Sequence, residues 1–82
     1  MDSFHYVYRL RSLRVPTQTY IGLTKNLRLR LLKNNEGGVP HTAKFRPWTL
    51  DLAIAFPSRD KAAAFEAYLK TGSGREFARR HF

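Results

Sequence analysis

The sequence predicts an α/β fold: a small, mostly antiparallel three-stranded sheet flanked by helices, in the order β-β-α-β-α-α. Three observations lead to this prediction. An aromatic segment alternates with period two, two later segments begin with a residue suited to cap a helix, and an apolar strand-like segment lies between them. The chain has 82 residues and no cysteine. This length has room for one modest core, so we expect a single domain over residues 1–82, without disulfides or thiolate metal sites.

Residues 4–11 predict the first strand, because every second position carries an aromatic or aliphatic side chain that would share one face. These positions are Phe4, Tyr6, Tyr8 and Leu10. Residues 12–17 include Pro16 and have the length of a hairpin connection. Residues 18–23 then predict a second short strand, antiparallel to the first.

A first helix is predicted from Asn26, which is a good N-cap, to about residue 35. The side chains expected to face the core are Leu27, Leu31 and Leu32. Gly37 and Gly38 supply a left-handed stop for this helix. Residues 39–47 are rich in basic and polar side chains and predict a loop.

Residues 48–56 form the most apolar stretch and predict the third strand. Strict alternation would place Leu50, Leu52, Ile54 and Phe56 on one face and Asp51, Ala53 and Ala55 on the other. We therefore expect helices to cover both faces of this strand.

Ser58 predicts the cap of a second helix that runs to about residue 70, with Asp60 in the first turn, where the helix dipole favours an anion. Gly72 would close this helix. Residues 73–76, Ser-Gly-Arg-Glu, have the pattern of a capping box and predict a short terminal helix.

The charge of the chain points to a polyanionic partner. Lys and Arg number 15 against 6 Asp and Glu, which gives a formal net charge of +9, and no acidic residue lies between Asp2 and Glu36. Such clustering attracts phosphate backbones, with an affinity that falls steeply with salt. The alternative is a merely solvated basic surface. A membrane is a poor fit, because no run of about 18 apolar residues and no signal peptide is found, and we expect a cytoplasmic protein.

Binding a polyanion does not imply catalysis, so we looked for residues that could cleave a phosphodiester. The sequence has no Ser/His/Asp set at recognisable spacing, no Gly-rich phosphate loop and no carboxylate cluster for two metals. The remaining candidates lie on the paired strands, on the first helix and inside the second helix. They are Tyr6, Tyr8, Tyr20, Arg30 and Glu66.

These residues carry a resemblance to a known family. Tyr6-Val7-Tyr8, then Tyr20-Ile21-Gly22, then Arg30 ten residues after Tyr20, resemble the signatures of the GIY-YIG nuclease domain, which is also found in the UvrC excision nuclease. The second signature is present verbatim. Residues 41–48, 65–70 and 72–75 are similar to a small stand-alone bacterial branch of this family. The resemblance covers nearly the whole chain.

The resemblance implies a metal-dependent endonuclease that hydrolyses phosphodiester bonds in DNA, with single-stranded or branched DNA as expected substrates. One of Tyr8 and Tyr20 would accept the proton of the attacking water, with nearby Arg lowering the phenol pKa. Arg30 would neutralise the scissile phosphate, and Glu66 would hold one divalent ion, Mg²⁺ or Mn²⁺. The supporting residues would be Tyr6, Asn34 and His41. The expected DNA contacts are Arg9, Arg28, Lys44, Arg46, Arg75, Arg79 and Arg80.

One departure from the family keeps a second function open. Many members carry a His or Tyr one helical turn after the Arg, and this chain has Asn34, which cannot act as a base. The alternative is therefore a nucleic-acid-binding module with weakened catalysis. Glu66 has an alternative as well, since it lies four residues before Lys70 and could form a plain helix-surface ion pair.

Overall fold

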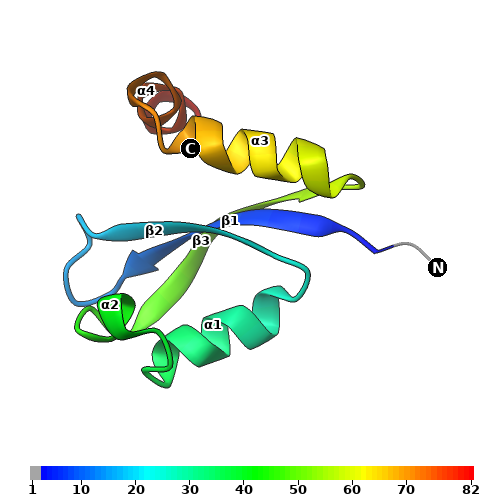
Figure 1. Cartoon of the computed structure of the whole chain (residues 1–82). Coiled ribbons are helices and arrows are strands. Elements are labelled where there is room, and N and C mark those ends of the chain that lie inside the picture. Colours follow the sequence, from blue (N-terminus) through cyan, green and yellow to red (C-terminus); the bar gives the residue numbers. More distant parts are fainter. Residues whose placement is uncertain (1–2) are drawn as a thin grey trace.

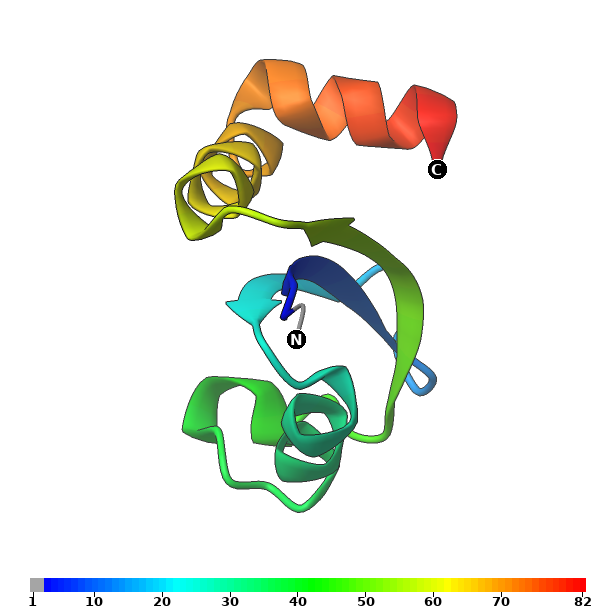
Figure 2. The ribbon, with the colours of Figure 1, turned by 90° about the vertical axis from the view of Figure 1, so that its right-hand side faces the viewer.

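The computed structural model describes residues 3–82, and its elements form three layers (Figures 1 and 2). A three-stranded sheet lies in the middle, helices α3 (Arg59–Leu69) and α4 (Gly72–His81) lie on one side, and α1 (Leu27–Asn35) and α2 (Pro40–Ala43) lie on the other. The predicted fold class is confirmed. Met1 and Asp2, which the predicted domain includes, lie outside the described residues.

The sheet consists of β1 (His5–Ser12), β2 (Thr19–Thr24) and β3 (Trp48–Phe56) in the order β2-β1-β3, with both pairs antiparallel. The expectation that helices cover both faces of β3 is wrong, because β3 is an edge strand and only Trp48 in it is buried. The strand covered on both faces is β1, which pairs with both neighbours. Val7 and Tyr8, which point to opposite faces, are 0% and 1% exposed.

A bulge changes the face to which part of β3 points. Leu52 pairs with Arg9 and Leu50 pairs with Leu10, so Asp51 is an extra residue between them. Side chains of directly opposed residues share a face, and Leu50 therefore lies on the face opposite to Leu52. The expectation that these two leucines share one face is wrong for this reason.

Helix α1 begins where Asn26 predicts it, because the Asn26 side chain accepts a hydrogen bond of 3.0 Å from the Leu29 amide. Gly37 has a φ of 84° and turns the chain after the helix, as expected. Leu27 and Leu31 pack against the core, but Leu32 is 50% exposed. Leu27 and Leu31 are four residues apart and form one stripe, and Leu32 lies outside that narrow stripe.

The segment predicted as a loop contains the short helix α2. Its first residue is Pro40, a residue that fits the first helical position because it has no amide hydrogen to leave unpaired. Thr42 in this helix is buried, and its carbonyl accepts a hydrogen bond of 2.9 Å from the Trp48 indole. This contact joins α2 to the start of β3.

The two C-terminal helices begin with side-chain caps. Ser58 caps α3 as predicted, accepting a hydrogen bond from the Lys61 amide. The predicted start of α4 is wrong: the cap is Thr71, whose hydroxyl accepts a 3.0 Å hydrogen bond from the Gly74 amide, so Gly72 lies inside α4. Gly74 packs so closely against the backbone of Tyr68 that a side chain there would collide with it, which fixes the sharp turn between the helices.

The sheet separates two small cores. Beneath α3 and α4, Val7 packs with Ala62, Leu69 and Ala78. Above α1, the buried residues are Tyr8, Leu10 and Trp48, with partly buried side chains around them. Within residues 3–82, no helix has both the length and the apolar character that crossing a membrane requires.

Gly22→Ala is predicted to destabilise the protein. The added methyl group would lie 2.5 Å from Cζ of Tyr8 and closer still to its hydroxyl oxygen, and Tyr8 is buried with little room to move. Overpacking of this kind costs about 1–3 kcal/mol. The measurement is the free energy of unfolding in urea.

Gly72→Ala is the matched control, because nothing lies within 4 Å of the added atom and the position is helical. This change should leave stability equal or raise it by about 0.4–1 kcal/mol. Equal effects of the two substitutions would contradict the prediction.

Candidate active site

A cavity of about 670 Å³ opens at the free edge of β2, between α1 and α3. Three of the four predicted catalytic residues line it: Tyr20 from β2, Arg30 from α1 and Glu66 from α3. They come from three elements and both helical layers. The structure thus brings together, at one edge of the sheet, side chains that are up to 46 positions apart in the sequence (66 − 20 = 46).

Tyr8, the fourth predicted catalytic residue, lies behind the cavity in the central strand. It pairs with Gly22, and its ring centroid is 6.3 Å from that of Tyr20. The missing side chain of Gly22 leaves room for the Tyr8 hydroxyl. Among the described residues this buried hydroxyl has no hydrogen-bond partner. A buried polar group without a partner is costly, so its presence favours a functional role.

The electrostatics of Tyr8 differ from the expectation. Burial, and then the nearby Tyr20, raise the pKa of Tyr8 from 10.0 to about 12, although the Arg30 charge acts to lower it. Arg30 thus acts in the expected direction, but the expectation of a lowered phenol pKa is wrong for Tyr8, because desolvation of the phenolate is the larger effect. Tyr8 stays protonated at neutral pH and is suited to donate a hydrogen bond, not to accept a proton.

Asn34 connects two helices and does not line the cavity. Its side chain is fully buried, donates a 2.9 Å hydrogen bond to the Arg30 carbonyl and accepts one of 2.7 Å from the Thr42 hydroxyl. This places α2 against α1. His41, the neighbour of Thr42, is exposed, and its ring centroid lies 5.9 Å from that of Tyr20.

Tyr6, the remaining supporting candidate, is half-buried two residues before Tyr8. It pairs with Thr24 on β2 and with Ala55 on β3, and its ring contacts that of Phe4. Tyr6 does not line the cavity.

Glu66 is the one carboxylate among the residues that line the cavity. Its side chain is 23% exposed and accepts a hydrogen bond of 3.3 Å from the Lys70 ammonium. The ion pair on the helix surface that the sequence left open as an alternative role for Glu66 is therefore present as well. Three basic residues of the cavity were not singled out from the sequence as site candidates: His5, Lys25 and Arg59. Arg59 lies seven residues before Glu66, two helical turns away on the same face, and this spacing could have identified it.

The seven cations expected to bind DNA are distributed over separate places. Arg9, Arg75 and Arg79 line a second hollow, beneath α4. Arg28 is exposed on α1, and Arg80 is exposed near Glu76 on α4. Lys44 and Arg46 follow α2, where the Lys44 ammonium lies over the Phe45 ring and the Arg46 guanidinium donates to the Ala43 carbonyl.

Comparison with known proteins assigns the chain to a family. The family model of the GIY-YIG catalytic domain matches residues 4–80. The chain belongs to the GIY-YIG family. The match includes all four predicted catalytic residues, and the resemblance found in the sequence is confirmed.

The curated relatives of this GIY-YIG chain are fungal proteins. A protein of Candida dubliniensis named structure-specific endonuclease subunit SLX1 is 41% identical over 77 residues, which cover 85% of this chain and 27% of the relative. The proteins of the same name from Malassezia globosa and Debaryomyces hansenii are 44% and 42% identical, over 72% and 82% of this chain. The match with the Malassezia protein covers 14% of that relative and the match with the Debaryomyces protein 21%. The chain thus spans about a quarter or less of the relatives it matches, and they are fungal, unlike the bacterial branch that the sequence resembles.

The raised pKa of Tyr8 predicts a pH dependence of stability. An unfolded tyrosine loses its proton near pH 10, whereas buried Tyr8 keeps its proton to about pH 12. The unfolded state therefore binds fewer protons between these values, and stability falls as the pH rises through this window. The contribution of this group is on the order of 2–3 kcal/mol.

The test compares chemical denaturation of the native protein and Tyr8→Phe between about pH 9 and pH 12, a range set by the two pKa values. The substitution should remove the part of the pH dependence of unfolding free energy that belongs to Tyr8. The part that comes from Lys and the other tyrosines should remain. Identical slopes in the two proteins would contradict the assignment.

Proposed function

We propose that residues 1–82 form one GIY-YIG nuclease domain that hydrolyses a phosphodiester bond in branched DNA. The observation that carries the proposal is the cavity in which Tyr20, Arg30 and Glu66 meet in front of Tyr8. A base, a cation and a carboxylate around one hollow are the groups that phosphodiester hydrolysis requires. The formal net charge of +9 favours a polyanionic substrate.

The protein groups divide the reaction between them. Arg30 neutralises the charge that develops on the scissile phosphate, because a guanidinium can hold two phosphate oxygens in its fork. As Tyr20 takes the proton of the attacking water, its hydroxyl gives its own proton to His41, whose imidazole lies beside the Tyr20 ring and becomes the imidazolium. Tyr8, which remains protonated, donates a hydrogen bond that holds the phosphate or the water in place.

The cavity fits one divalent ion, Mg²⁺ or Mn²⁺. The described residues contain no group of three or more metal-ligating side chains, as an all-protein metal site would need. Mg²⁺ keeps most of its waters, and one or two carboxylates together with substrate phosphates are sufficient to bind it. Glu66, half-buried and paired with only Lys70, would hold the ion. When bound, the ion would neutralise charge at the leaving oxygen.

Branched DNA is proposed from two arguments. The relatives carry the name structure-specific endonuclease subunit, and they are more than 40% identical to this chain. The cavity that Tyr20 and Glu66 line has a volume of about 670 Å³, which is room for part of one strand and not for a duplex. A junction offers unpaired strands that fit narrow hollows.

Glu66→Gln is predicted to abolish metal-dependent cutting while leaving binding intact. The substitution keeps the shape of the side chain and removes the charge that would hold the ion. Cutting of labelled flap, single-stranded and duplex DNA with Mg²⁺, with Mn²⁺ and with chelator is the measurement. A rate loss on the order of 10³-fold or more is expected.

Asp60→Asn is the matched control for Glu66→Gln, because Asp60 is exposed on the same helix and does not line the cavity. It should retain the full rate. Tight, salt-sensitive binding by the native protein with no cutting under any condition would favour the alternative, a nucleic-acid-binding module with weakened catalysis.

His41→Gln is predicted to lower kcat by about 10²–10⁴-fold with little change in KM, because the imidazole would take part in proton transfer and not in ground-state binding. The control is His81→Gln on α4, because the His81 ring lies against Phe77 and not against Tyr20. The measurement is steady-state cleavage of a flap substrate. A rise in KM alone would reassign His41 to a DNA contact.

A further inference from the structure

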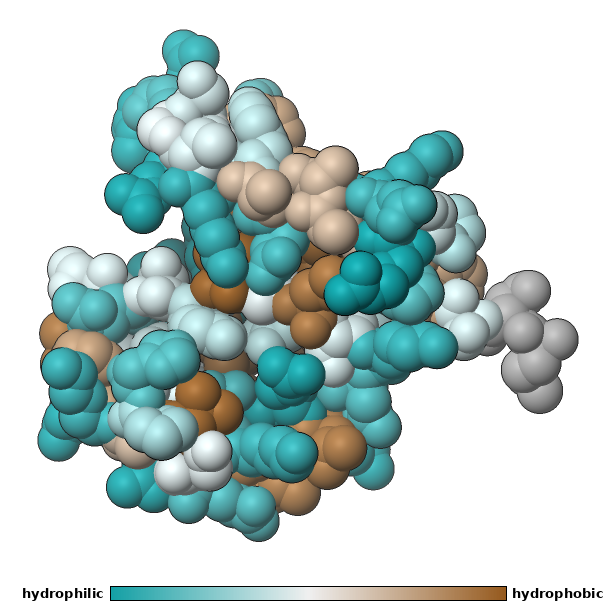
Figure 3. All heavy atoms as spheres, viewed as in Figure 1, coloured by the Kyte–Doolittle hydropathy of each residue, from teal (hydrophilic) through white to brown (hydrophobic). Residues whose placement is uncertain are grey.

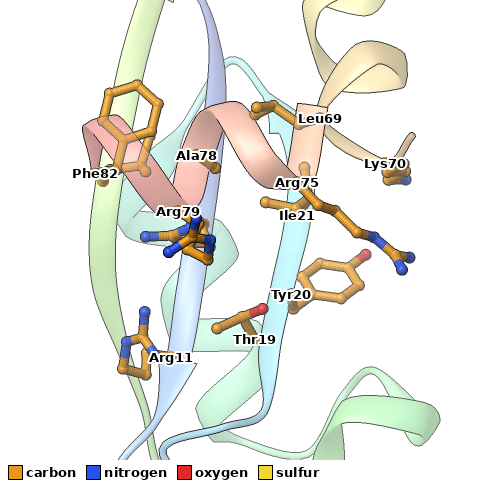
Figure 4. Close-up of a pocket in the computed structure, with 12 residues that line it drawn as sticks. Arg11, Thr19, Tyr20, Ile21, Leu69, Lys70, Arg75, Ala78, Arg79 and Phe82 are labelled. Atoms are coloured by element: carbon orange, nitrogen blue, oxygen red, sulfur yellow. The ribbon is translucent and has the colours of Figure 1, made fainter. Parts of the chain in front are cut away.

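A second hollow, of about 650 Å³, lies between α4 and the sheet, on the face opposite α1. Its floor is formed by residues of β1, β2 and β3, and α4 crosses in front of the strands (Figure 4). The space-filling view shows hydrophilic side chains over α4 and a depression between this helix and the end of the sheet (Figure 3). We call this hollow the α4 groove.

The α4 groove is strongly basic. Its lining contains five cationic side chains and no Asp or Glu: Arg9, Arg11, Lys70, Arg75 and Arg79. Carboxylates outside the lining pair with two of them, Glu76 with Arg79 and Glu66 with Lys70. Asp51, the bulged residue, reaches the groove from outside and bonds both Arg9 and Arg11 through one oxygen, at 2.6 and 3.1 Å. One carboxylate therefore holds two guanidinium groups in place. The three groups together keep a net positive charge, because two cations share one anion.

The Asp51 carboxylate is firmly ionised. Burial opposes its charge, but hydrogen bonds from Arg11 and Arg9 lower the pKa of Asp51 below its usual value. Arg9 is largely covered, with a side chain that is 12% exposed. The two guanidinium groups are thus fixed in direction by a partner that stays charged at neutral pH, which is the arrangement expected of a built anion site.

The groove also has an apolar floor, which distinguishes it from a purely electrostatic patch. The apolar side chains lining it are Ile21, Leu52, Leu69, Ala78 and Phe82. Nucleotides combine an anionic phosphate with a flat, largely apolar base, and proteins that bind single strands pair cations with such surfaces. The volume lies within the range of about 300–1,000 Å³ that holds one small ligand, so a single strand fits and a duplex does not.

The groove and the active-site cavity share Tyr20, which lines both. The side chains of Arg75, Lys70 and Tyr20 project to the same side of β2 (Figure 4). Lys70 in turn contacts Glu66 of the cavity. A strand whose scissile phosphate lies at Arg30 can therefore continue past Tyr20 into the groove.

We propose that the α4 groove binds the unpaired arm of a branched DNA and thereby selects a junction over a plain duplex. The inference rests on the proposed nuclease function and adds the site at which the unpaired strand would be recognised. Arg75 and Arg79 contact its phosphates, and the apolar floor receives its bases. A continuous duplex has no strand to place in the groove and gains nothing from it.

The test measures binding in chelator, so that it does not depend on cutting. The probes are labelled DNA duplexes that carry an unpaired thymidine arm of increasing length, beside the blunt duplex. The native protein should bind more tightly as the arm lengthens, until the groove is filled. Arg75→Gln combined with Arg79→Gln should remove this gain, on the order of tenfold, and lower the salt slope by about one for each lost phosphate contact.

Lys61→Gln is the control for each single Arg→Gln change, because it also removes one unit of charge, from an exposed position on α3 that lines neither hollow. Lys61→Gln should still bind more tightly as the unpaired arm lengthens. Arg75→Lys should recover part of the arm-dependent affinity that Arg75→Gln loses. Arg75 and Arg79 are exposed, so these changes leave the core intact. Persistence of the gain in the double variant, or an equal loss in Lys61→Gln, overturns the proposal.

Cleavage with Mg²⁺ separates this inference from the proposed function. If the native protein cuts branched DNA and the double variant still prefers the armed probe, the nuclease stands and the groove assignment fails. If the native protein cuts nothing but the double variant loses the arm-dependent binding, the groove assignment stands and the nuclease fails.

Discussion

The burial of Tyr8 in the central strand is the constraint on which the rest of the site depends. A tyrosine ring at the centre of so small a sheet needs space on the neighbouring strand, and Gly22 provides it by having no side chain. The pairing of Tyr8 with Gly22 sets the register of β1 against β2, since a slip of one residue would move every side chain to the other face. That register places Tyr20 beside Tyr8 at the open edge. The same burial keeps the Tyr8 phenol protonated, so that Tyr8 can donate a hydrogen bond beside its half-buried neighbour Tyr20.

A buried polar network supports the other wall of the cavity. Asn34 joins α1 to α2 through Thr42, and the Thr42 carbonyl accepts from the Trp48 indole of β3. Each such hydrogen bond contributes about 0.5–1.5 kcal/mol net to stability. Removing one partner costs more, because it leaves the other buried polar group without a hydrogen bond. A histidine in place of Asn34 would have to satisfy the same partners from a fully buried position. In this chain the imidazole near Tyr20 belongs to His41 instead, on the helix that Asn34 holds in place.

Eight of the 15 Lys and Arg side chains line two hollows that meet at Tyr20, one at the free edge of β2 and one beneath α4. On one side Arg30 shares the cavity with Glu66, where a cation and a carboxylate are suited to chemistry on a phosphate. On the other side Asp51 orients two guanidinium groups without neutralising both, which suits binding without reaction. Under the proposed function, the first hollow would be the cutting site and the second would recognise the shape of the substrate.

The sequence by itself determined the local features and the family. Period-two alternation over residues 4–11 predicted the strand that carries Tyr8, and Asn26 and Ser58 predicted two helix starts, because each of these signals acts within a few residues. The signatures around Tyr8 and Tyr20 identified the catalytic candidates. Only the tertiary structure decided that β1 and not β3 is central, that Asp51 bulges, that Thr71 caps α4 and that the cations occupy separate places. Arg9 and Asp51, for example, are 42 positions apart, and a contact over that distance depends on strand pairing that no local pattern encodes.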